Sequence, residues 1–128
     1  MKLRLALLVS LVALTFALTF APAASAKFCV RIAVDPARPG VGVAARVLLT
    51  TLSGPGSRPM RVDRTYPMRV AATGRGRSFE LELLPALGEP ALWWARIRFP
   101  RPGAWTISWA NWGAPDSPCA PTLRVRVR

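Results

Sequence analysis

The chain has 128 residues, contains no histidine, and carries 18 lysine and arginine residues against 6 aspartate and glutamate residues, a formal net charge of +12. This length predicts a single domain. The lack of histidine excludes Ser-His-Asp and Cys-His catalysis and the usual histidine-based zinc and copper sites.

The N-terminal segment has the pattern of a targeting signal. A basic start is followed by an apolar run from Leu5 to Phe20 and by the small residues Ala24-Ser25-Ala26. This order predicts an N-terminal signal helix cleaved after Ala26, so that residues 1–26 are a signal peptide and residues 27–128 form the exported domain.

The alternative for this segment is an uncleaved anchor. The charge-free run from Leu5 to Ala24 would span roughly 30 Å as a helix, which is long enough to cross a bilayer. Cleavage would instead remove Lys2 and Arg4 and lower the formal charge from +12 to +10. In either case the remaining domain is strongly basic.

The rest of the chain alternates apolar and polar residues with period two, and proline or glycine interrupts it about every ten residues. This is the pattern of an all-β protein. We expect strands at Phe28–Val34, Val41–Thr51, Met60–Val62, Tyr66–Thr73, Ser78–Leu84, Leu92–Phe99, Ala104–Ala110 and Thr122–Arg128. About seven strands in this length predict an immunoglobulin-like two-sheet sandwich, with a barrel as the alternative.

The two cysteines, Cys29 and Cys119, are expected to pair in a chain that leaves the cytoplasm. Closing a loop of about 90 residues would stabilise the fold by roughly 4–5 kcal/mol in the chain-entropy model. The alternatives are two free thiols or a metal pair, and two thiolates without histidine make a poor metal site.

Three motifs give the chain a family resemblance. They are Asp-Pro-Ala-Arg-Pro-Gly at 35–40, Phe-Glu-Leu-Glu-Leu-Leu-Pro at 79–85 and Phe-Pro-Arg-Pro-Gly-Ala-Trp-Thr-Ile at 99–107. In this order the chain resembles the small exported bacterial Ig-like domains of the YtkA-like type, in which a Gly-x-Trp step, here Gly103 and Trp105, opens a late core strand. Related sandwiches handle copper through histidine and methionine, and this chain offers only Met60 and Met68 after cleavage.

The glutamates Glu80 and Glu82 are the one pair of carboxylates with a catalytic spacing. They lie two apart on an expected strand, about 7 Å along the chain, as an acid and base pair in a hydrolase can. We favour a solvated strand face on which they meet arginines of a neighbouring strand, because Phe79 and Leu81 form the opposite, apolar face. No catalytic residue and no metal ligand is therefore predicted.

Strand phase divides the tryptophans between core and surface. Trp93, Trp105 and Trp109 share phase with apolar neighbours and are predicted to be buried, whereas Trp94 and Trp112 are out of phase. These two are either exposed or covered by the loops at 53–59 and 113–121.

The arginines of two strands are expected to point outward. Arg96 and Arg98 would form one stripe beside Trp94, and Arg124 and Arg126, followed by Arg128, another, giving a basic sheet face. The alternative is a merely solvated surface in a chain that uses arginine in place of lysine.

Together these features predict a non-enzymatic binding or accessory module without a cofactor, located in the periplasm, outside the cell or at the envelope. Its partner would be a protein or an anionic surface, bound through Trp94, Arg96, Arg98, Trp112, Arg124 and Arg126. Export argues against nucleic acid, and the membrane would be reached only through an uncleaved N-terminal segment. The alternatives are envelope copper handling and anionic-polymer binding by the arginine-rich face.

Overall fold

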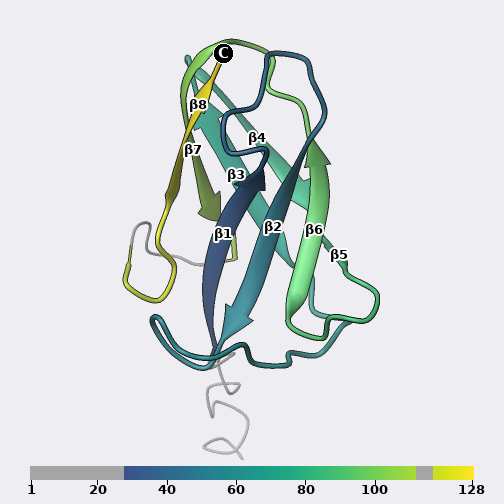
Figure 1. Cartoon of the computed structure of the whole chain (residues 1–128). Helices are drawn as coiled ribbons and strands as arrows, with labels where there is room; N and C mark the ends of the chain where they lie inside the picture. The colour runs from purple at the N-terminus through teal and green to yellow at the C-terminus, as the bar shows by residue number, and fades with distance from the viewer. Residues whose placement is uncertain (1–27, 112–116) are drawn as a thin grey trace, which may run out of the picture.

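A computed structural model describes residues 28–111 and 117–128, and this part of the chain is all-β (Figure 1). It holds eight strands: β1 (Cys29–Asp35), β2 (Ala45–Leu52), β3 (Arg69–Gly74), β4 (Arg77–Glu82), β5 (Leu84–Pro85), β6 (Leu92–Ile97), β7 (Gly103–Trp109) and β8 (Leu123–Val127). The all-β prediction is confirmed. The signal helix and its cleavage site lie outside the described residues, and within those residues no helix is long and apolar enough to cross a bilayer.

The strands form two four-stranded antiparallel sheets that lie face to face (Figure 1). The first sheet has the order β1-β2-β6-β5 and the second has the order β4-β3-β7-β8. Leu83 is the step at which the chain leaves the second sheet and re-enters the first, because β5 begins directly after it. Neighbours in the sequence are therefore not always neighbours in a sheet.

The core lies between the two sheets and is built by the predicted alternation. In β1 the buried positions Val30, Ile32 and Val34 alternate with exposed ones, and β7 buries Trp105, Ile107 and Trp109 in the same way. Trp93 is also fully buried. The prediction that these three tryptophans belong to the core is confirmed, since side chains two apart on a strand share a face.

Two expected strands differ most from the structure, whereas the ends of the others shift by at most three residues. Met60–Val62 forms no strand: the backbone N–H of Met60 bonds to the Thr51 carbonyl, and prolines at 59 and 67 cannot donate to a ladder. The strand expected from Val41 begins only at Ala45, because residues 40–43 form a tight turn with a hydrogen bond from Val43 N–H to the Gly40 carbonyl. Val41 and Val43 are consequently exposed.

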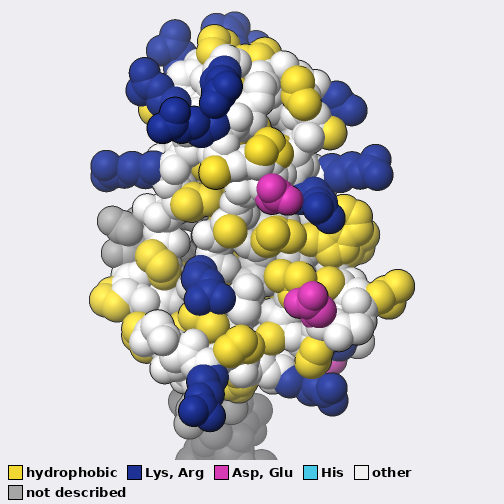
Figure 2. Space-filling model, in the orientation of Figure 1, with side chains coloured by type: hydrophobic (Ala, Val, Ile, Leu, Met, Phe, Trp, Pro, Cys, Tyr) yellow, Lys and Arg dark blue, Asp and Glu magenta, His cyan; other side chains and the backbone are white. Residues whose placement is uncertain are grey.

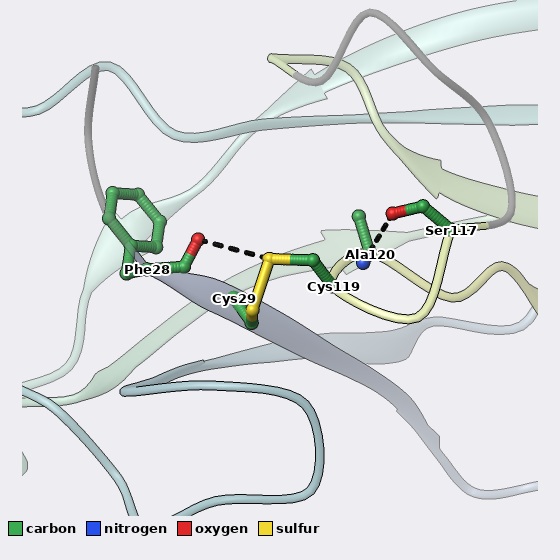
Figure 3. Close-up of a disulfide and its surroundings, with 5 residues drawn as sticks. All are labelled: Phe28, Cys29, Ser117, Cys119 and Ala120. Atoms are coloured by element: carbon green, nitrogen blue, oxygen red, sulfur yellow. Dashed lines mark hydrogen bonds between the residues drawn. A yellow bond between two sulfur atoms is a disulfide. The ribbon is translucent and has the colours of Figure 1, made fainter.

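The predicted disulfide joins Cys29 and Cys119, which lie 90 residues apart in sequence and 4.5 Å apart between Cα atoms (Figure 3). It fastens the first residue of β1 to the loop that precedes β8. Next to it, the Val30 N–H donates a 2.9 Å hydrogen bond to the Cys119 carbonyl. The disulfide therefore closes the sandwich where the edge strands of the two sheets meet.

Candidate binding surface

The first predicted stripe lies on the outer face of the first sheet. Trp94 is half-buried there, with Leu48 and Leu84 on either side of it in register, and the exposed Arg96 lies opposite Arg46. Arg98 is exposed beyond the end of β6, where it donates a 2.7 Å hydrogen bond to the Gly42 carbonyl. Trp94 is thus flanked by the aliphatic side chains of neighbouring strands.

The second predicted stripe lies on the other sheet, so the two stripes do not share one sheet face. Arg124 and Arg126 are exposed on β8, an edge strand of the second sheet, whereas Arg96 lies on the first. Residues that point outward from two packed sheets face in opposite directions. Trp112, the remaining member of the predicted surface, lies outside the described residues.

The sheets instead gather arginines at one end of the molecule, which we call the basic end. They come from four segments: the β1–β2 loop, the β3–β4 turn, the β6–β7 turn and the end of β8. Figure 2 shows these basic side chains crowded at the end where Figure 1 marks the C-terminus. All are exposed, and they are Arg38, Arg75, Arg77, Arg98, Arg101, Arg126 and Arg128.

Direct contacts hold the four segments together. The Gly42 N–H donates to the Phe99 carbonyl at 3.0 Å, and the Val41 N–H donates to the Arg128 carbonyl at 3.1 Å, so the β1–β2 loop is tied to two other segments. The side chain of Arg75 packs against Gly103, because a Cβ placed on Gly103 would lie only 3.1 Å from the Cδ of Arg75. The arginines of the basic end therefore project from a single, connected surface.

Few carboxylates offset this positive charge. Asp35 is the one described acidic side chain near the basic end, and it forms a 3.5 Å ion pair with Arg46. Glu80 and Glu82 lie on β4 in the second sheet, where Glu80 pairs with Arg69 at 3.6 Å, and Asp63 and Glu89 lie in loops of the opposite end. Within the described chain, none of the seven arginines forms an ion pair with an acidic side chain.

The glutamate pair behaves as the strand-face interpretation predicts. Glu80 and Glu82 are exposed on β4, while Phe79 and Leu81 pack against the core. Glu80 meets an arginine of the neighbouring strand β3, which is Arg69. The carboxylates therefore lie on an open sheet face.

The methionines weighed as copper ligands are part of the core. Met68 is fully buried, and Met60 is half-buried against the same cluster. The described residues contain no group of three or more histidine, cysteine, aspartate or glutamate side chains that could hold a metal ion. Copper binding by Met68 would require the core to open.

A second arginine-lined feature lies at the opposite end, which we call the disulfide end. A hollow of about 560 Å³ there is lined by Arg61, Arg64 and residues 85–90. Arg64 donates hydrogen bonds to the carbonyls of Pro90, Leu92 and Ala86, and its guanidinium lies 4.8 Å from the centre of the Trp93 ring. Its donors are occupied by the fold itself, so this hollow offers less free positive charge than the basic end.

Most arginines of the basic end could not be predicted from strand phase. Arg38, Arg75 and Arg101 lie in the connections between strands, where the alternation of buried and exposed positions does not apply. Each of the three sits in a connection that contains glycine or proline, but such connections occur at both ends of the sandwich, so only the fold shows that these arginines share one end. No family model matches the chain, and no curated protein matches its sequence.

Proposed function

We propose that this protein is an exported, non-enzymatic binding module of the Ig-like type, and that its basic end holds anionic ligands. Two antiparallel sheets over one core and the resemblance to the YtkA-like domains support the Ig-like assignment. The N-terminal pattern supports export, and a disulfide suits an oxidising compartment.

One observation carries the binding role. Seven exposed arginines from four segments converge on one end, and the single described carboxylate side chain near them, Asp35, is already paired with Arg46. A guanidinium presents a planar fork of donors that matches phosphate, sulfate and carboxylate groups. Such a surface attracts anions by contacts that weaken as salt is added.

The surroundings of the glutamates support the non-enzymatic part of the proposal. A hydrolase that works through a pair of carboxyl groups needs one of them held protonated beside a cleft. Glu80 is instead exposed and paired with Arg69 on an open sheet face. We expect Glu80→Gln to leave ligand binding unchanged. A hydrolytic activity that this substitution abolished would contradict the proposal.

The binding role is tested by elution of the mature protein from immobilised heparin in a salt gradient. We expect Arg38→Ala/Arg77→Ala/Arg101→Ala to elute at clearly lower salt, with the slope of log affinity against log salt falling by roughly 3, one for each lost contact. These side chains are exposed and form no ion pair in the described chain, so the variant should fold normally.

A charge-matched control separates the basic end from net charge. Arg31→Ala/Arg58→Ala/Arg61→Ala also removes three exposed arginines, all nearer the disulfide end. This control should elute close to the unaltered protein. Equal shifts for the two triple variants would mean that overall charge, and not the basic end, holds the polymer.

A further inference from the structure

We propose that the basic end docks onto an anionic membrane surface, with Val41 and Val43 entering the interface between the lipid headgroups. This inference rests on the proposed anion-binding function and adds the kind of surface that is bound. It differs from the expectation that the chain meets a membrane only through an uncleaved N-terminal segment.

The starting observation is a pair of exposed aliphatic side chains among the arginines. Val41 is 40% exposed and Val43 is 57% exposed, and both belong to the β1–β2 loop of the basic end. Large apolar side chains are exposed at few other described positions, which are Leu84 and Leu87. Figure 2 shows apolar atoms between the basic side chains at this end.

The local backbone holds the valines outward. Residues 40–43 form a β-turn closed by the hydrogen bond from Val43 N–H to the Gly40 carbonyl at 3.2 Å. Gly42 has a φ of +68°, as the third residue of a type II turn requires. Val41 is then the second residue of the turn, at its tip, and cannot turn inward to the core without breaking this hydrogen bond.

Contacts around Gly42 place the valines beside positive charge. Its carbonyl accepts the 2.7 Å hydrogen bond from the Arg98 side chain, and its N–H donates to the Phe99 carbonyl. The Val41 N–H donates to the Arg128 carbonyl. Both valines therefore lie next to exposed arginines in a turn that is anchored on two sides.

This combination favours a bilayer over a soluble polyanion. A hydrated sulfated or phosphorylated polymer can satisfy the arginines, but it removes little apolar surface from water. A bilayer interface can bind both the arginines and the valines, because anionic headgroups attract the guanidinium groups and the adjoining acyl region accepts aliphatic side chains. The exposed valines would contribute nothing to the first ligand and would strengthen binding to the second.

The test compares sedimentation of the protein with vesicles of phosphatidylcholine mixed with phosphatidylglycerol and with vesicles of phosphatidylcholine alone. We expect binding only to the anionic vesicles. Val41→Ser/Val43→Ser should weaken vesicle binding roughly tenfold, because the variant lacks the apolar side chains that would be transferred from water into the bilayer interface. Elution of the same variant from heparin should not change.

Two further variants control for surface apolarity in general. Leu87→Ser removes a side chain that is 99% exposed in the loop after β5, at the disulfide end, and should leave vesicle binding unchanged. Val43→Leu adds one methylene and should strengthen binding about two- to fourfold. Circular dichroism on each variant confirms that the fold is kept.

The outcomes distinguish this inference from the proposed function. If Arg38→Ala/Arg77→Ala/Arg101→Ala weakens heparin binding but the valine variants bind vesicles like the unaltered protein, the membrane inference is overturned and the anion-binding role stands. If that triple variant changes neither heparin nor vesicle binding, both are overturned. Equal losses for Leu87→Ser and the valine pair would also overturn the membrane inference.

Discussion

At the disulfide end an arginine is part of the fold, whereas at the basic end arginines are presented to solvent. Arg64 lies over Trp93 and donates to the Pro90 carbonyl at 3.0 Å and to the Leu92 carbonyl at 3.3 Å. Among the seven arginines of the basic end, the described chain shows one side-chain hydrogen bond, from Arg98 to the Gly42 carbonyl. The same residue type therefore has two different uses in one small domain.

The physical reason is the length of the connections at each end. Long loops at the disulfide end leave carbonyl groups without ladder partners, and buried carbonyls need donors. Arg64 supplies some of them, and the fully buried Thr51 hydroxyl lies within hydrogen-bonding distance of the Met60 and Ala91 carbonyls. At the basic end the Phe99 and Arg128 carbonyls accept hydrogen bonds from the backbone N–H groups of Gly42 and Val41, so fewer arginine donors are needed there and most of its arginines remain free for a ligand.

The largest expected effect is on the disulfide. Cys29→Ser/Cys119→Ser should lower the free energy of unfolding by roughly 4–5 kcal/mol, because the unfolded chain regains the entropy of a loop of about 90 residues. Urea unfolding followed by tryptophan fluorescence measures it, and the reduced unaltered protein should give the same value. A loss below about 1 kcal/mol would show that the disulfide end does not carry the stability of the fold.

A paired substitution tests the two uses of arginine directly. Arg64→Met should cost about 2–4 kcal/mol in unfolding free energy, because it removes the interaction with Trp93 and the donors to the carbonyls of three residues. Arg101→Met, at the basic end, should change it by less than about 0.5 kcal/mol. Thermal and urea denaturation of both variants measures the two changes in unfolding free energy. Similar losses at the two sites would contradict the claim that arginine is structural at the disulfide end only.

The smallest effect is a pH dependence confined to the disulfide end. The Thr65 backbone N–H and the Thr65 hydroxyl both donate to the Asp63 carboxylate. These hydrogen bonds, with the backbone one having the larger effect, lower the pKa of that group below 3.8. Since the folded-state pKa is the lower one, this contribution to stability is present above pH 3.8 and is lost as the pH falls through the folded pKa.

Asp63→Asn should therefore reduce the steepness of the acid-side loss of stability, measured as urea midpoints over a pH series. Arg38→Ala/Arg77→Ala/Arg101→Ala is the control, because these side chains lie at the other end of the molecule from Asp63, and it should keep the full steepness. An unchanged pH profile for Asp63→Asn would mean that the two hydrogen bonds from Thr65 do not favour the charged carboxylate.

Much of the fold follows from local patterns. The alternation in 28–34 and 104–110 predicts which side of each strand is buried, and it places Trp105 and Trp109 in the core correctly. The disulfide was predictable because only two cysteines are present. That Met60–Val62 forms no strand was not predictable, since a short apolar stretch between prolines can contact a core without a partner strand.

The sequence by itself determined the all-β architecture, the buried tryptophans and the disulfide, because period-two alternation and a single cysteine pair leave few alternatives. Only the tertiary structure decided which arginines share a surface. Assignment of β6 to one sheet and β8 to the other separates Arg96 from Arg124, while the antiparallel connections bring Arg38, Arg75 and Arg101 to the same end. Phase along a strand specifies the inward and outward sides, but strand order is set by packing between residues far apart in the chain.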